Sequence, residues 1–195
     1  MSLDLNVYVK QVDDSIIPKW IERMNQFDME CEIHPDFSFA DHSGFLPFRI
    51  KFKNPENEEF KDKEFISGFE FYKDEFDFQK ELDSLQPKKS LFQRILNKPT
   101  EKVEYVNKEI DSKLVDCKLI LTFNWGSYNS LELRMSSLSS AIISELTDGV
   151  CSYPADDVWY DNKTIVEDAY KELKEYENSL NLNDWKMNKF EGWND

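Results

Sequence analysis

The stretch from Val115 to Trp125, Val-Asp-Cys-Lys-Leu-Ile-Leu-Thr-Phe-Asn-Trp, is the most strand-like part of this sequence. Its continuous apolar centre, 119–121, is typical of a central strand that is buried on both faces. After it, leucine, isoleucine and methionine recur every three or four positions, which predicts a helix over about 130–147. Gly149 stands where the stop of that helix is expected.

Toward the N-terminus the chain begins with a β-α-β pattern. Strand-like runs at 5–9 and 29–33 flank an apolar stripe that predicts a helix over about 15–27. Alternating apolar and polar residues predict two further strands, at 48–52 and 65–72, the second with Gly68 as a candidate β-bulge.

Between these strands and the central one, helical character is expected at 74–84 and 103–114. Beyond the central helix, Val150–Tyr153 predicts a short edge strand that Pro154 closes. A final amphipathic helix is predicted over 163–180.

This order of elements predicts an α+β fold with a mixed or antiparallel sheet and helices packed on one face. A ferredoxin-like split β-α-β arrangement is the most economical form of it. We expect a single α+β domain over 1–180, with a basic insertion at 86–102 that we expect to be mobile, followed by an aromatic C-terminal tail over 181–195.

The composition limits the classes of partner. The net charge is −15, from 39 acidic and 24 basic residues, and so large a negative charge disfavours nucleic acid and anionic membrane lipids. It favours a basic protein partner, although acidity can also serve solubility alone.

The chain offers no sign of a membrane span or of secretion. No long uncharged apolar run and no basic leader are visible, and three widely spaced cysteines give no disulfide framework. We therefore expect a cytoplasmic protein.

Motifs for common enzyme chemistry are missing from the sequence. The five glycines are too far apart for a phosphate-binding loop, and no serine lies in a nucleophile elbow. The sequence thus predicts a protein that is not an enzyme and that needs no cofactor.

The two histidines provide one alternative. His34, Asp36, Asp41 and His42 lie within one predicted loop and could form a mixed nitrogen and oxygen metal site for a metal-dependent hydrolase. Their spacing fits no established metal motif, and a polar loop in which aspartate and histidine cap turns explains the same residues.

Acidic residues alternate with aromatic residues in 56–83 and again in 145–184. Aromatic anchors surrounded by acids suit a basic protein, although aromatic core residues with acids on the opposite face produce the same pattern. The favoured partner-binding residues lie in the loop that follows the predicted edge strand: Asp156, Asp157, Trp159, Tyr160 and Asp161.

This last region resembles small bacterial toxin-immunity proteins, in which a helix ending in Asp-Gly leads into a G-V-x-x-x-P strand and a W-Y loop. Here the residues are Asp148-Gly149-Val150, Pro154 and Trp159-Tyr160, and the fragments 45–48 and 68–71 add to the resemblance. It covers the last third of the chain and these fragments, and its motifs are structural. It implies an α+β protein that neutralises a toxin by binding it.

Besides the metal-dependent hydrolase, the sequence supports two functional hypotheses. The first is a cytoplasmic protein that binds a basic protein, with an immunity role by steric blockade as its most specific form. The second is a structural subunit of a larger assembly, with the aromatic segment 185–193 as its docking strip.

Overall fold

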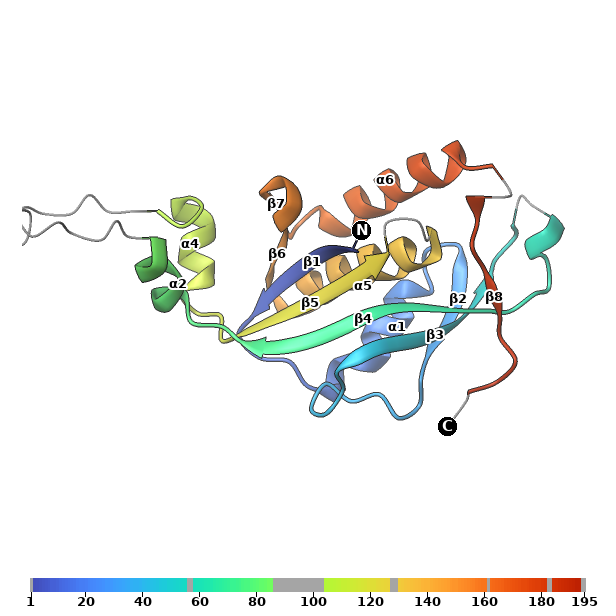
Figure 1. Cartoon of the computed structure of the whole chain (residues 1–195), viewed down its shortest axis with the longest axis horizontal. Coiled ribbons are helices and arrows are strands. Elements are labelled where there is room, and N and C mark those ends of the chain that lie inside the picture. Colours follow the sequence, from blue (N-terminus) through green and yellow to red (C-terminus); the bar gives the residue numbers. More distant parts are fainter. Residues whose placement is uncertain are drawn as a thin grey trace, which may run out of the picture.

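The computed structural model describes residues 2–55, 58–85, 104–126, 130–160, 162–181 and 184–193 (Figure 1). The basic insertion at 86–102 and Asp161 lie outside these residues. The remainder forms one α+β unit built on a single sheet.

Every strand pair in the sheet is antiparallel, and the strand order is β2-β3-β4-β5-β1-β6-β7, with β8 paired to β4. The strands are β1 (Ser2–Val9), β2 (Met29–Ile33), β3 (Gly44–Phe52), β4 (Phe65–Glu75), β5 (Leu119–Gly126), β6 (Val150–Tyr153), β7 (Val158–Tyr160) and β8 (Asn188–Lys189).

The α+β class and the antiparallel sheet are confirmed, and the main helical layer lies on one face. The sheet has more strands than a ferredoxin-like arrangement. β1 and β2, which helix α1 (Ile17–Met24) connects, run parallel with three strands between them. The predicted edge strand 150–153 is not at the edge, because the chain turns back after Pro154 and adds β7 outside it.

The central stretch of the sequence becomes β5, which lies between β4 and β1. Its alternate residues Leu121, Phe123 and Trp125 face the main core and are almost fully buried. Leu119 and Ile120 are only half-buried. The strand is therefore fully buried on its inner face, and not on both faces as the apolar run predicts.

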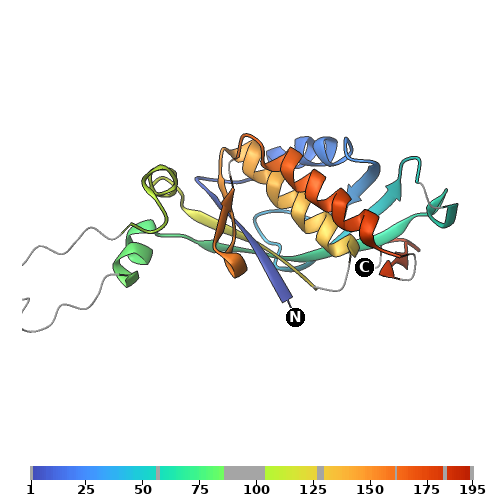
Figure 2. The same ribbon diagram turned by 90° about the horizontal axis from the view of Figure 1, so that it is seen from above.

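Three helices, α1 (Ile17–Met24), α5 (Ser130–Thr147) and α6 (Ile165–Ser179), form the layer over the inner face. α5 crosses β4, β5 and β1, and α6 lies beside α5 (Figure 2). α5 is buried on most sides, which explains why its serines at 136, 139, 140 and 144 are inaccessible. The residue with left-handed backbone at its end is Asp148, at φ 49°, rather than Gly149.

Gly68 lies in a regular β-ladder and not in a bulge. A Cβ at this position would lie 1.9 Å from the carbonyl oxygen of Leu46 on β3. The glycine is therefore required for the close approach of two backbones.

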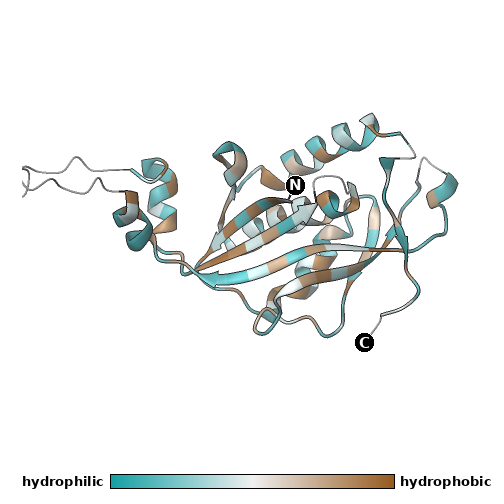
Figure 3. Cartoon of the chain, in the orientation of Figure 1, coloured by the Kyte–Doolittle hydropathy of each residue, from teal (hydrophilic) through white to brown (hydrophobic). Residues whose placement is uncertain are grey.

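Two short helices, α2 (Phe78–Leu85) and α4 (Lys108–Leu114), extend from one end of the sheet (Figure 1). They enclose a second small core on the outer face, in which Phe76, Leu114 and Cys117 pack with Tyr8 and Val150. In Figure 3 the ribbons of α2, α4 and α6 are mainly hydrophilic, with single hydrophobic positions between them.

The C-terminal tail folds back onto its own chain. Trp185 and Met187 pack on Phe60 and Phe65, and the two residues of β8 pair with the start of β4. The aromatic residues expected to form a docking strip are thus in part used within the domain.

Candidate functional site

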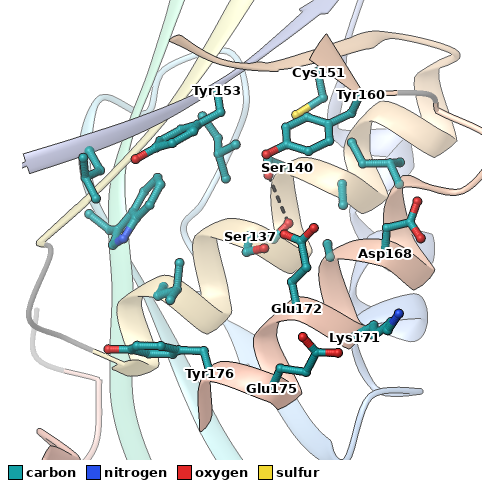
Figure 4. Close-up of a pocket in the computed structure, with 17 residues that line it drawn as sticks. Ser137, Ser140, Cys151, Tyr153, Tyr160, Asp168, Lys171, Glu172, Glu175 and Tyr176 are labelled. Carbon is teal, nitrogen blue, oxygen red and sulfur yellow. Dashed lines mark hydrogen bonds between the residues drawn. The ribbon is translucent and has the colours of Figure 1, made fainter. Parts of the chain in front are cut away.

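A cavity of about 620 Å³ lies between α6, α5 and the strands β1, β5, β6 and β7 (Figure 4). We call it the α6 groove. Its volume is within the range of ligand-binding pockets and exceeds that of a single side chain.

Small residues on α5 leave the space that forms the groove. Ser137, Ser140 and Ala141 face it at positions where large side chains would fill the gap between α5 and the hairpin of β6 and β7. Ser140 is satisfied within its own helix, because its hydroxyl donates to the carbonyl oxygen of Ser137 at 3.0 Å. The Ser140 hydroxyl therefore needs no hydrogen-bond partner from a ligand.

Aromatic rings form much of the remaining wall. Trp125, Tyr153, Tyr160 and Tyr176 all line the groove. Trp125 is 6% exposed and stacks on Tyr153, with ring centroids 6.3 Å apart. Tyr153 and Tyr160 are half-buried and leave part of each ring toward the cavity (Figure 4).

Carboxylates of α6 complete the groove. Asp168, Glu172 and Glu175 line it at intervals of four and three residues, and therefore lie along one face of the helix. None of them forms an ion pair with a described lysine or arginine, whereas Glu145, Glu167 and Glu177 all do. Lys171 is the one basic residue among the described lining residues. The groove therefore carries an uncompensated negative charge.

The tyrosine pKa values report the same environment. Burial, together with the nearby Cys151 and Glu172, raises the pKa of Tyr160 to about 12. Burial, together with the charge of Asp156, also raises the pKa of Tyr153. Both phenols therefore remain neutral near pH 7 and add no charge to that of the acids.

The structure divides the residues that the sequence favoured for partner binding. Trp159 and Tyr160 are neighbours in β7, so their side chains point to opposite faces of the sheet. Tyr160 lines the groove, and Asp156 lies close enough to raise its pKa. Trp159 instead stacks on Tyr8 on the outer face, with ring centroids 5.5 Å apart, and its indole N–H donates to Asp157.

The four residues of the alternative metal site are used differently. The Nδ1 atom of His34 accepts from the backbone N–H of Asp36, and its ring packs against Trp193. The Nε2 atom of His42 lies 3.2 Å from the carbonyl oxygen of Gly44. Within the described parts of the chain, no group of three histidine, cysteine, aspartate or glutamate side chains could hold a metal ion.

Sequence reasoning identified Tyr160 and the acidic region 145–184, but not the groove. Trp125 and Tyr176 are 51 positions apart in the sequence, and only the packing of α6 beside α5 over the sheet brings them to one cavity. The available signal was the spacing of the three acids, which places them on one side of the last predicted helix.

Searches for similar proteins and for membrane helices give no further assignment. None of the helices described here is long and apolar enough to cross a membrane. Comparison with protein-family models, with curated proteins and with solved structures finds no significant match to this chain.

Proposed function

We propose that this protein binds a basic protein and that the α6 groove receives cationic side chains of that partner. The observation that carries the proposal is the combination, in one cavity, of four aromatic residues with three carboxylates that have no described basic partner. Aromatic anchors in pockets supply much of the binding energy of protein interfaces, and unpaired charge favours an oppositely charged partner.

The charge of the whole chain supports the same class of partner. A net charge of −15 attracts a basic protein at long range and accelerates its encounter. All three cysteines are free and buried, which fits the proposal that the protein acts in the reducing cytoplasm.

An immunity role is the most specific form of this proposal. A toxin that is basic would be neutralised by steric blockade, with Tyr160 in the groove and the nearby Asp156 as contacts. Asp157 and Trp159, on the other side of the hairpin of β6 and β7, would extend the contact surface.

A matched pair of triple variants tests the proposal. The groove variant is Asp168→Asn, Glu172→Gln, Glu175→Gln. The control variant is Glu22→Gln, Glu30→Gln, Glu75→Gln, which removes the same charge from exposed acids on α1, β2 and β4. Each immobilised protein is incubated with cell lysate at low salt, and retained proteins are identified by mass spectrometry.

We expect the wild type and the control variant to retain the same basic protein, and the groove variant to lose it. Salt should release the partner from the wild type, since screening weakens attraction between exposed charges. Equal retention by all three proteins would show that the groove is the wrong surface. Equal loss from both variants would assign binding to the overall charge.

A further inference from the structure

We infer that the cationic group the α6 groove accepts is the guanidinium of arginine, in preference to the ammonium of lysine. This inference rests on the proposed function and specifies the chemistry of the same site. Three features of the groove favour arginine: its flat aromatic walls, the position of one carboxylate and its apolar floor.

The sheet side of the cavity presents aromatic ring surfaces. Tyr153, stacked on Trp125, and Tyr160 project into the groove from β6 and β7 (Figure 4). A guanidinium is planar and stacks on such faces through both cation–π and dispersion contacts. An ammonium is a compact charge and gains only the electrostatic part of this contact.

The carboxylate of Glu172 is the one best placed to meet a cation inside the cavity. Its side chain extends toward Ser137 and Ser140, while Glu175 and Lys171 lie nearer the rim (Figure 4). A carboxylate can accept two parallel N–H bonds from a guanidinium, and this fork geometry is not available to lysine. Asp168 and Glu175, about one helical turn away on either side, add attraction for flanking basic residues.

The floor of the groove determines the cost of removing water from the cation. Leu5, Ala141, Cys151 and Ile165 line the deep part, and all four side chains are buried. The guanidinium is more weakly hydrated than the ammonium, so its transfer to an apolar floor costs less. The methylene groups of the arginine side chain also find apolar contacts there.

Short peptides test the preference without knowledge of the partner. Binding of tetra-arginine, tetra-lysine and asymmetrically dimethylated tetra-arginine to the full chain is measured by isothermal titration calorimetry at low ionic strength. The wild type is compared with the groove and control variants defined above, and with Tyr153→Leu, which removes one ring and no charge.

We expect tetra-arginine to bind the wild type and the control variant at least ~5-fold more tightly than tetra-lysine. Dimethylation, which keeps the charge but blocks the bidentate contact, should reduce the affinity for the arginine peptide. Tyr153→Leu should lower the affinity for tetra-arginine and leave that for tetra-lysine nearly unchanged.

Two different results distinguish failure of this inference from failure of the proposed function. Equal affinity for the arginine and lysine peptides, lost in the groove variant alone, would overturn the arginine preference and leave the basic-partner groove standing. Binding that is absent from the wild type, or equal in the groove and control variants, would overturn both.

Discussion

Arg134 is a buried charge that links three parts of the chain. It is 1% exposed, and its Nη1 atom donates to both carboxylate oxygens of Glu177 on α6, at 2.5 and 2.8 Å. Its Nη2 atom donates to the carbonyl oxygen of Phe27 at 2.7 Å. The guanidinium thus joins α5 to α6 and to the turn before β2, in a region where water cannot replace a lost partner.

Replacement of Glu177 by glutamine should therefore destabilise the protein strongly. The change leaves the buried Arg134 charge without its ion-pair partner, and loss of one partner of a buried ion pair costs about 3–5 kcal/mol. Urea unfolding measures the free energy. The control is Glu175→Gln, an exposed acid on the same helix, for which we expect a change within ~0.5 kcal/mol. A loss below about 1 kcal/mol for Glu177→Gln would contradict the structural role of the pair.

Single-residue environments were the part of the structure least visible in the sequence. Arg134 follows Leu131 in the predicted helix, and nothing in the spacing shows that its head group is buried beside Glu177. The Arg134 charge can be buried only because Glu177 pairs with it. The two residues are 43 positions apart in the sequence and meet only when α5 and α6 pack together. Trp159 and Tyr160 differ for a simpler reason, because side chains alternate across a strand.

At the scale of elements, local pattern predicted more. The helices expected at 130–147 and 163–180 are α5 and α6 to within about two residues. The first helix is shorter than expected, since residues 14–16 form a 3-10 turn before α1. Periodicity reports which face of an element is buried, but not which elements meet, so the strand order could not be derived.

The turn between α1 and β2 is attached to α6 through Asp28. The Tyr170 hydroxyl donates to its carboxylate, and Lys174 lies 3.5 Å away. The Tyr170 hydrogen bond, helped by the charges of Lys174 and Arg134, lowers the pKa of Asp28 below its ordinary value of 3.8. The ionised form is therefore favoured in the folded state, and the stabilisation is complete above pH 3.8 and lost as the pH falls through the lowered pKa.

We expect Asp28→Asn to lower the free energy of unfolding at pH 7 and to lose this difference from the wild type at about pH 2. The effect should be less than ~1 kcal/mol, because the carboxylate is half-exposed and screened by water. Asparagine tolerates the left-handed backbone at this position, where φ is 51°. Urea unfolding at several pH values provides the test, with Glu30→Gln as a control that should follow the wild type. A difference that persists unchanged to pH 2 would contradict the assignment to the ionised carboxylate.

For the whole molecule, the sequence predicts the net charge but not how the charges are distributed over the folded protein. The charge of −15 predicts repulsion within the folded chain. Many acids relieve it locally, such as Asp28 with Lys174, Glu32 with Arg49 and Asp116 with Lys10. The acids of the α6 groove have no described basic partner, so repulsion should concentrate there. Such concentration is expected of a binding surface, since sites tuned for a ligand often lower the stability of the free protein.

The two triple variants defined for the binding test should therefore differ in stability as well. Each changes the net charge from −15 to −12, but only the groove variant removes neighbouring like charges, at spacings of four and three residues on one helix. We expect its melting temperature to exceed that of the control variant at low salt, and the gap to close in about 0.5 M NaCl, where the Debye length falls to a few ångströms. Thermal unfolding by circular dichroism at both salt concentrations measures the gap. A groove variant that melts below the control variant at low salt would mean that the three carboxylates stabilise the free protein. Repulsion between them would then give no support to the inference that they bind a cationic partner.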